Sequence, residues 1–380
     1  MSQRAIPAVF MRGGSSKGVF FHARDLPGDR SVLDPILLSV IGSPDPYGRQ
    51  IDGMGGGISS LSKAVIIGPP TRPDCDVDYT FAQVSVDKPV VDWASNCGNL
   101  SSAVGPFAVD EGLVAAGDVG SGDGEALVRI HQVNTSKVIH ARFPVSGGKA
   151  VVTGGFAIAG VAGTGARIRL DFLDPGGAGT GRLLPTGNPR DLLDVPGFGP
   201  VPVSMVDAAN PIVFVAAGNL GLTGTELPDA IEARPGIMAA LDWIRRQAGV
   251  AMGMAARPED APLSVPKVAM LAAPASYTTL DGQTVGADAQ DIAVRMISME
   301  RAHRAVPLTG AMCLGVAARL PGTVAHALAR AAGGDEVRVA NPSGVLSVGA
   351  EVEGGEAKSA LVFRTARRLM QGEVLIPSMS

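Results

Sequence analysis

The segment YTFAQVSV (79–86), with WASNCGN (93–99) and NLSSAVGPFAVDEGLV (99–114) after it, decides how this chain folds. Its first part is short and rich in β-branched and aromatic residues, which predicts a strand. Its last part has the spacing of a helix built from small residues. The turn between them contains Cys97, close to the expected start of the helix. We therefore expect a strand, a tight turn and a helix in close succession.

Cys97 is the strongest candidate for chemistry in the chain. Free backbone N–H groups and the positive end of the helix dipole favour the thiolate form of a cysteine at the start of a helix. An isolated cysteine in such a place is more often a small buried apolar residue. The neighbours Asn96, Gly98 and Asn99 favour turns and close backbone approach, so the chemical role is the better interpretation here.

The rest of the chain predicts a mixed α/β fold. Short apolar runs bounded by Gly and Pro indicate further strands at 8–11, 18–21, 63–67, 126–133, 137–143, 212–217 and 267–273. Helical patterns are fewer and lie at 31–42, 235–250, 288–299, 313–320, 323–332 and 358–370. Because strands are not regularly followed by helices, a doubly wound parallel sheet is not expected.

Length and composition indicate two domains in one chain of 380 residues. The segment 172–200 is dense in Gly and Pro and separates two halves of similar size. We expect domains at 1–185 and 186–380, with a C-terminal segment that can return to the first domain. SNCGNLSSAVGPFA (95–108) and LTGAMCLGVAARLPG (308–322) resemble each other weakly, which suggests a duplication.

Several classes of protein are excluded by composition. The net charge is −4 and the aromatic fraction is 4%, which argues against a nucleic-acid partner. No apolar stretch reaches the roughly 18 residues of a membrane span, and the start lacks a secretory leader. Three cysteines fit a reducing cytoplasm better than a disulfide framework. The five histidines show no metal-ligand spacing and no CxxC occurs, so no metal site is expected.

Three polar segments could bind an anion. DGMGGGISSLSKAVII (52–67) offers glycine N–H groups and then Lys63, which could become a base if it is buried beside the apolar strand. RGGSSKG (12–18) is a second polar turn, and His303 with Arg304 could bind a carboxylate. Each has a simpler interpretation as a solvated turn or as surface charge. Together with Cys97 they point to proton transfer on a small, multiply charged carboxylic acid, without a cofactor.

The chain resembles the PrpF-type isomerases, whose fold is that of diaminopimelate epimerase. The resemblance runs through MRGGSSKGVFF, GSPDPYGRQIDGMGGGISSLSK, DVDYTFAQVSVDKPVVDWASNCGNL, LLPTGN, LGLTGTEL, VPKVAML, LTGAMC and RTARRLMQGEV. It covers residues 9 to about 375. The family implies two pseudo-symmetric domains, each a curved mixed sheet around a central helix, here near 98–113 and 311–332.

The resemblance also implies an activity and a site. Its members shift a C=C bond in unsaturated di- or tricarboxylates, and this chain looks most like the 2-methylaconitate isomerases of the methylcitrate cycle of propionate breakdown. The related 4-oxalomesaconate tautomerase and methylitaconate isomerase activities stay open. The family's catalytic pair maps onto Lys63 and Cys97. Substrate binding is expected from Arg12, Ser15, Ser16, Lys17, Gly55, Gly56, Ser60, Asn96, Gly98, Asn99, His303, Thr309 and Gly310.

In the expected mechanism Lys63 removes an allylic proton and Cys97 is its acid partner, although the two roles could be reversed. A homodimer or homotetramer is expected from the family, with an aconitase-like methylcitrate dehydratase as functional partner. Three alternatives remain. One is an amino acid epimerase that uses Cys97 and Cys313. The second is a thiol hydrolase with Cys97 and His303, and the third is an accessory protein of an aconitase-like hydratase.

Overall fold

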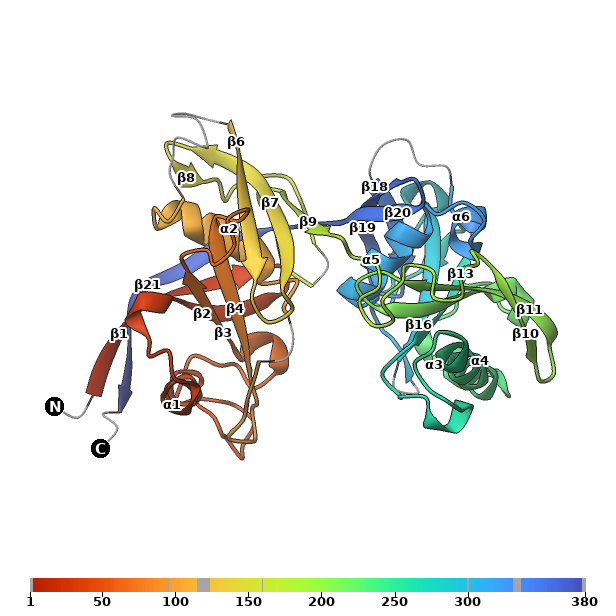
Figure 1. Cartoon of the computed structure of the whole chain (residues 1–380), viewed down its shortest axis with the longest axis horizontal. Helices are drawn as coiled ribbons and strands as arrows, with labels where there is room; N and C mark the ends of the chain where they lie inside the picture. Colours follow the sequence, from red (N-terminus) through yellow and green to blue (C-terminus); the bar gives the residue numbers. More distant parts are fainter. Residues whose placement is uncertain are drawn as a thin grey trace. The chain divides into compact units, whose positions relative to one another are not determined.

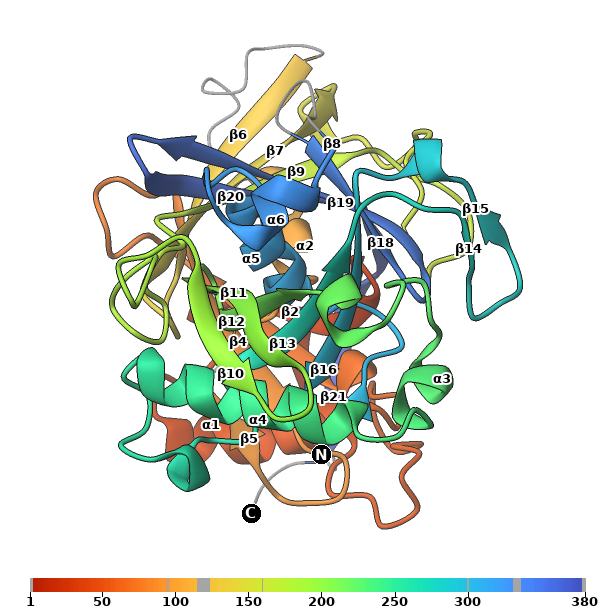
Figure 2. The same cartoon turned by 90° about the vertical axis from the view of Figure 1, so that its right-hand side faces the viewer.

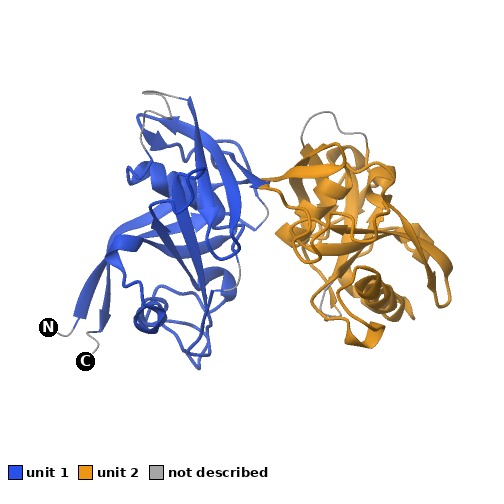
Figure 3. Ribbon diagram, viewed as in Figure 1, with its two compact units in different colours: residues 1–172, 363–380 blue, residues 173–362 orange. Residues whose placement is uncertain are grey.

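The computed structural model describes residues 3–93, 96–114, 124–158, 160–298, 301–330 and 336–377. The chain forms two compact units, which Figure 3 shows in different colours. Unit 1 comprises Met1–Phe172 together with Phe363–Ser380, and unit 2 comprises Leu173–Val362. The chain thus leaves unit 1 at residue 172, where we expected a boundary at 185, and its last 18 residues belong to unit 1.

Unit 1 is built on a mixed sheet in the spatial order β21-β1-β2-β3-β4-β6-β7. The pairs β2–β3 and β4–β6 are parallel, and the other neighbours are antiparallel. Three short strands, β5 (Val91–Asp92), β8 (Lys149–Ala150) and β9 (Ile168–Leu173), pair with β4 or β7. The main strands are β1 (Gln3–Gly13), β2 (Ser16–His22), β3 (Lys63–Gly68), β4 (Val77–Val84), β6 (Gly124–Gln132), β7 (Lys137–Ser146) and β21 (Ala366–Pro377).

Two helices lie on opposite faces of this sheet (Figure 1). Helix α1 (Arg30–Ile41) begins at Asp29, whose carboxylate accepts the N–H of Ser31, and packs its apolar side against alternate residues of β2, β3 and β4. Helix α2 (Ser101–Asp110) contacts β1, β6, β7, β8 and β21, so the curved sheet surrounds it. We call the α1 side the outer face and the α2 side the inner face.

Unit 2 repeats the same arrangement. Its sheet has the order β10-β11-β12-β13-β16-β18-β19-β20, with β12–β13 and β16–β18 parallel and the other neighbours antiparallel. The strands are β10 (Asp191–Val195), β11 (Gly199–Asp207), β12 (Pro211–Ala216), β13 (Lys267–Ala272), β16 (Ile292–Ser298), β18 (Glu336–Asn341), β19 (Gly344–Glu353) and β20 (Glu356–Arg364). Short β17 (Arg301–Ala302) pairs with β16, and β14 (Tyr277–Thr278) and β15 (Thr284–Val285) form a separate two-stranded sheet.

The helices of unit 2 also occupy two faces. Figure 2 shows α4 (Ile237–Ala251) and α5 (Leu308–Ala317) on opposite sides of β11, β12 and β13. Short helices α3 (Pro228–Glu232) and α6 (Val324–Leu328) accompany them. Because the order of parallel and antiparallel pairs is the same in both units, α1 corresponds to α4 and α2 to α5. The fold class that the resemblance implied is therefore confirmed, with a mixed sheet around a central helix in each unit.

Glycines allow the central helices to approach their sheets and fix how the repeats correspond. A Cβ atom on Gly105 of α2 would lie 2.6 Å from Phe143 of β7. A Cβ atom on Gly315 of α5 would lie 3.1 Å from the carbonyl oxygen of Gly349 in β19, the strand equivalent to β7. Gly105 and Gly315 are thus equivalent positions. Counting back from them, the residue of unit 2 that corresponds to Cys97 is Pro307.

Three helix predictions are wrong. The segment 288–299 contributes strand β16, and 358–370 contributes parts of β20 and β21. Strand β16 is buried on both faces from Ile292 to Ile297, with Arg295 among its buried residues, so its sequence has no alternation of apolar and polar residues to distinguish it from a helix. The expected central helix at 311–332 is interrupted, because α5 ends at Ala317 and α6 begins at Val324. Among the residues described, no helix has the length and apolar character needed to cross a lipid bilayer.

Candidate active site

Lys63 begins β3 and lies on the inner face of unit 1. It is only 8% exposed, and its Nζ atom donates to Oε1 of Gln83 at 2.5 Å. The same Nζ lies 4.9 Å from the ring centroid of Phe81. A carbonyl acceptor and the face of an aromatic ring both favour the positively charged ammonium. Gln83 was not among the expected site residues.

Cys97 stands at the start of α2, as the sequence predicted. Its side chain is buried, and its carbonyl oxygen accepts the N–H of Ser101 at 3.0 Å, which begins the helical hydrogen bonding. The hydroxyls of Ser101 and Tyr79 donate to the same carbonyl oxygen at 3.0 and 3.5 Å. Burial raises the pKa of Tyr79, and negative charge on Cys97 raises it further, so the phenol stays a donor. These contacts fix the backbone that carries the thiol.

Lys63 and Cys97 meet the same part of the inner face. Alternation along β3 and β4 places Lys63 and Tyr79 on that face, and the Tyr79 hydroxyl contacts the carbonyl of Cys97. A Cβ atom on Gly18 of β2 would lie 3.0 Å from the carbonyl oxygen of Lys63 and 3.0 Å from Cδ1 of Leu100, three residues after Cys97. The backbone at Lys63 and the turn that carries Cys97 therefore lie close together on the inner face, at the start of β3 and of α2.

Arg364 is the last residue of β20 and lies in the part of that strand that belongs to unit 1, where it adds a buried positive charge to this neighbourhood. It is 7% exposed, and its Nε atom donates to Oδ1 of Asn99 at 3.1 Å. Burial lowers the pKa of Arg364 to about 10, and the nearby Cys97 opposes this fall. The guanidinium therefore lies where it can stabilise negative charge on the sulfur. Arg364 occurs in the family-like stretch RTARR, but nothing in the local sequence shows that it is buried beside Cys97.

The turn after β1 packs against the start of α2. Gly14 has a φ of +52°, and a Cβ atom there would lie 2.3 Å from Oδ1 of Asn99. The Asn99 amide nitrogen also donates to the hydroxyl of Ser15 at 3.2 Å. Arg12 is tied to the backbone instead, since its Nη1 atom donates to the carbonyls of Gly14 and Thr365. Of this turn, Ser15 is exposed and contacts Asn99 directly.

The remaining predicted residues of this turn and of the Cys97 turn differ in exposure. Ser16 is buried, and the Nζ atom of Lys17 lies 5.6 Å from the ring centroid of Phe10. Asn96 accepts the hydroxyl of Ser101 at 3.4 Å, and Gly98 is half-buried in the turn before α2. The structure thus brings Asn96, Gly98 and Asn99 to the start of α2 beside Cys97.

The glycine-rich loop 52–62 is held within the fold. The N–H of Gly55 donates to the carbonyl of Ile41 at the end of α1, at 3.0 Å, and the N–H of Gly57 donates to Gln50 at 2.9 Å. The Gly55 N–H, which we expected to bind an anion, is therefore already paired. Gly56 is exposed and Ser60 is half-buried. Gln83 joins the loop to Lys63, because its amide nitrogen donates to the carbonyl of Ser62 at 2.9 Å.

Comparison with known proteins now identifies the family. The family described as "PrpF protein" matches residues 3–377. The chain belongs to the PrpF family. It is 45% identical to the 2-methyl-aconitate isomerase of Cupriavidus necator, over 99% of this chain and 98% of the relative. It is 43% identical to the 3-methylitaconate isomerase of Eubacterium barkeri, over 98% of each chain. The protein is an isomerase, as these relatives are.

Other members of the PrpF family agree with this class. The 4-oxalomesaconate tautomerase of Pseudomonas putida is 39% identical over 99% of this chain and 97% of its own. A solved structure titled "Crystal Structure of Methylitaconate-delta-isomerase" superposes with a TM-score of 0.93 and 43% identity, over 99% of this chain and 97% of that one. These relatives carry different substrate names on one fold, so family membership alone leaves the substrate open.

Three predicted site residues of this PrpF family member lie in unit 2. His303 is half-buried just after β17, Thr309 is exposed in the first turn of α5, and Gly310 is buried beside it. Cys313 lies further along α5 and is fully buried, with its thiol donating to the carbonyl of Val206 at 3.5 Å. Burial raises the pKa of Cys313. These features make it a packing residue and remove the basis for a two-cysteine epimerase.

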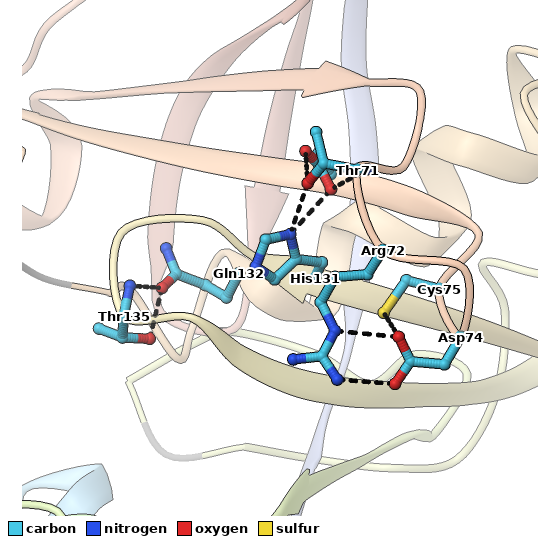
Figure 4. Close-up of polar contacts among 8 residues, drawn as sticks. Thr71, Arg72, Asp74, Cys75, His131, Gln132 and Thr135 are labelled. Carbon is cyan, nitrogen blue, oxygen red and sulfur yellow. Dashed lines mark hydrogen bonds and ion pairs between the residues drawn. The ribbon is translucent and has the colours of Figure 1, made fainter.

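A second polar cluster of unit 1 has a structural role. Figure 4 shows His131 beside Thr71, with Cys75 in the neighbouring turn. Asp78 and Thr71 both approach Nδ1 of His131, at 2.9 and 3.2 Å. In a nucleophile–histidine–acid relay the two partners would contact different ring nitrogens. This cluster therefore closes the loop before β4 and does not assemble a hydrolytic triad.

Proposed function

We propose that this protein isomerises 2-methylaconitate by moving a proton and a C=C bond within the allylic system. The observation that supports the proposal is that Lys63 and Cys97 are both buried, on segments that lie close together through Gly18 on the inner face of unit 1. The 45% identity to a 2-methyl-aconitate isomerase supports this substrate. A place in propionate breakdown in the cytoplasm, as a homo-oligomer working beside an aconitase-like dehydratase, is part of the same proposal.

The contacts of Lys63 and Cys97 favour one assignment of the general base and the general acid. The ammonium of Lys63 is supported by Gln83 and Phe81, whereas Arg364 and the start of α2 support negative charge on Cys97. In the proposed mechanism the Cys97 thiolate removes the allylic proton and the Lys63 ammonium donates one at the other end of the allyl system. This reverses the roles that we expected from the sequence.

Bonds, electrons and protons then balance over each turnover. The C–H bond breaks toward sulfur, its electron pair enters a dienolate delocalised onto the conjugated carboxylate, and a new C–H bond forms with a proton from Lys63. Rotation in the intermediate accounts for a change between cis and trans geometry. The enzyme returns to its starting state when the Cys97 thiol gives up its proton and the Lys63 amine regains one from solvent. Positioned acid–base groups of this kind typically contribute about 10²–10⁴-fold in rate.

A second candidate is the isomerisation of methylitaconate. A relative named for that activity is 43% identical, and a solved structure with that title superposes with a TM-score of 0.93. The two reactions share the allylic proton transfer, so the same residues serve both. The difference concerns the carboxylates that the protein binds and not the acid–base pair.

The test is a substrate panel followed by proton NMR in deuterated water. The purified protein is supplied with 2-methylaconitate, methylitaconate and oxalomesaconate, and deuterium incorporation at the allylic carbons is recorded. We expect 2-methylaconitate to turn over fastest, with loss of about 10²-fold or more in Lys63→Met and in Cys97→Ser. Lys88→Met and Cys75→Ser, which alter an exposed lysine and a cysteine outside the site, serve as controls. Wild-type rates in both site variants would refute the mechanism.

A further inference from the structure

The loop that follows α1 carries two large apolar side chains that are exposed to solvent. Tyr47 is 84% exposed and Ile51 is 71% exposed. Leu375, close to the end of β21, is 55% exposed. All three line one hollow of about 730 Å³ in unit 1. Single exposed apolar residues are common on protein surfaces, whereas several around one hollow are typical of a site that contacts another molecule.

The hollow lies between α1, the loop that follows it and the paired ends of β1 and β21. Pro35, Leu38 and Ser39 of α1 form one wall, and Gln3 and Pro377 at the strand ends form another. Helix α1 contacts β21, and Figure 1 shows the two ends of the chain on that side of unit 1. Because a helix and a pair of strands form these walls, the hollow keeps its shape without a partner.

The loop after α1 is held in one conformation by the carboxylate of Asp45. This carboxylate accepts the N–H groups of Tyr47 at 2.8 Å, Arg49 at 3.0 Å and Gln50 at 2.6 Å. The side chain of Gln50 is buried, which anchors the end of the loop in the fold. The exposed apolar side chains are thus presented on a fixed backbone, so their burial against a partner costs little conformational entropy of the loop.

The charges beside the apolar side chains have opposite signs. Arg49 precedes Ile51 by two residues and Asp52 follows it directly, and both charged side chains are exposed. A surface that carries both signs can face a copy of itself, with Arg49 of each copy near Asp52 of the other. A partner with charges of one sign would meet repulsion at one of the two residues. The charge pattern therefore favours a second copy of this chain over a strongly acidic or strongly basic partner.

We propose that this surface binds the same surface of a second copy of the chain across a two-fold axis. We call it the Tyr47 patch, and it comprises Tyr47, Arg49, Ile51, Asp52 and Leu375. In such a contact the ring of Tyr47 from each copy fills the hollow of the other, and tyrosine is frequent among the residues that contribute most to binding. The inference rests on the proposed function only for the expectation of a homo-oligomer, to which it gives a defined surface.

The experiment measures the molar mass of the full-length protein by analytical ultracentrifugation over a range of concentrations. Leu192→Lys, which alters an exposed leucine of β10 in unit 2, is the matched control for Tyr47→Lys and Ile51→Lys. We expect the dissociation constant for self-association to increase at least about tenfold in Tyr47→Lys and in Ile51→Lys, and to stay at the wild-type value in Leu192→Lys. Arg49→Asp and Asp52→Arg should each weaken self-association, and the double variant should restore most of it.

Cross-linking gives a second result that does not depend on breaking the contact. The three native cysteines are buried, so Ile51→Cys introduces an exposed thiol. Because Ile51 lies on the rim of the hollow, its two copies come close together across the axis. A short bismaleimide should therefore link Ile51→Cys into a covalent dimer, and it should leave Leu192→Cys and the wild type unlinked.

The outcomes separate this inference from the proposed function. A wild-type protein that is monomeric at every concentration would overturn the inference, and so would unchanged self-association in both Tyr47→Lys and Ile51→Lys. Equal cross-linking of Ile51→Cys and Leu192→Cys would also overturn it. If self-association responds as expected but no unsaturated acid is isomerised, the proposed function fails and the interface stands. If 2-methylaconitate is isomerised by a protein that stays monomeric, the interface fails and the activity stands.

Discussion

Substitution of Gly14 by alanine should disturb the start of α2 through direct contact. Gly14 has a φ of +52°, a backbone conformation that costs an alanine about 1 kcal/mol. The added Cβ atom would lie 2.3 Å from Oδ1 of Asn99 and 3.1 Å from Cδ of Arg364. Overpacking of this kind costs about 1–3 kcal/mol. We therefore expect Gly14→Ala to lower the free energy of unfolding by about 2–4 kcal/mol.

Gly112 provides a matched control. Its φ is +69°, and nothing lies within 4 Å of the position that a Cβ atom would take. Gly112→Ala thus carries the backbone cost of about 1 kcal/mol without the steric cost. For a domain of this size, each kcal/mol corresponds to about 2–4 °C in melting temperature. Thermal unfolding followed by circular dichroism should place Gly14→Ala clearly below Gly112→Ala.

The same substitution should also change the reactivity of Cys97. To admit the Cβ atom, Asn99 must shift, and its hydrogen bond with Arg364 would then be lost. The rate of alkylation of Cys97 by iodoacetamide, followed by peptide mass spectrometry, reports this loss without any need for a substrate. We expect a slower rate in Gly14→Ala and the wild-type rate in Gly112→Ala. Equal melting temperatures and equal alkylation rates in the two variants would refute the reasoning.

Three further predictions concern charge and packing. Arg364→Met should slow the alkylation of Cys97 at neutral pH by about tenfold, which corresponds to a loss of about 1.4 kcal/mol of electrostatic stabilisation. Arg364→Lys should retain most of the rate. Equal alkylation rates in the methionine and lysine variants would contradict the role of the charge. Burial alone would raise the pKa of Glu111, but Arg368 at 2.7 Å and His22 at 3.2 Å lower it below 4.5. The stabilisation that ionised Glu111 provides is thus present above pH 4.5 and is lost as the pH falls through the pKa of Glu111 in the folded protein. Glu111→Gln should therefore reduce the decrease in the free energy of unfolding at acid pH, measured by urea unfolding. Cys313→Ala should keep turnover near the wild-type value, because the Cys313 thiol is fully buried where α5 packs. A loss of turnover of more than a hundredfold would instead support the hypothesis of a two-cysteine epimerase.

The sequence predicted the elements whose pattern is local. Helix α1 was expected at 31–42 and lies at Arg30–Ile41, with its apolar residues at helical spacing and Gly42 as its C-cap. The position of Cys97 at the start of α2 also follows from local residues, since Asn and Gly favour the turn before the helix. The duplication could be suspected from two short segments and is established by the strand pairing.

What the sequence could not show depends on contacts between distant segments. Arg364 lies 265 residues from Asn99 in sequence, and no local pattern could indicate that they share a hydrogen bond. Gln83 reaches Lys63 only because β3 and β4 are antiparallel with that register. The role of Gly55 was misjudged for a related reason. Its N–H is used by Ile41 of the preceding helix, so glycine is needed there for close packing.

The asymmetry between the repeats explains how a duplicated fold can carry one reaction. Both units place a lysine at the first residue of the fourth strand of the sheet, β3 in unit 1 and β13 in unit 2, on the face of the central helix. Only unit 1 adds a cysteine at the helix start and a buried arginine beside it. The equivalent place in unit 2 holds Pro307, and its nearby titratable group is His303. The proposed proton transfer uses the lysine together with the Cys97 thiol, and unit 2 has Pro307 in place of that cysteine, so the same chemistry is expected in unit 1 alone.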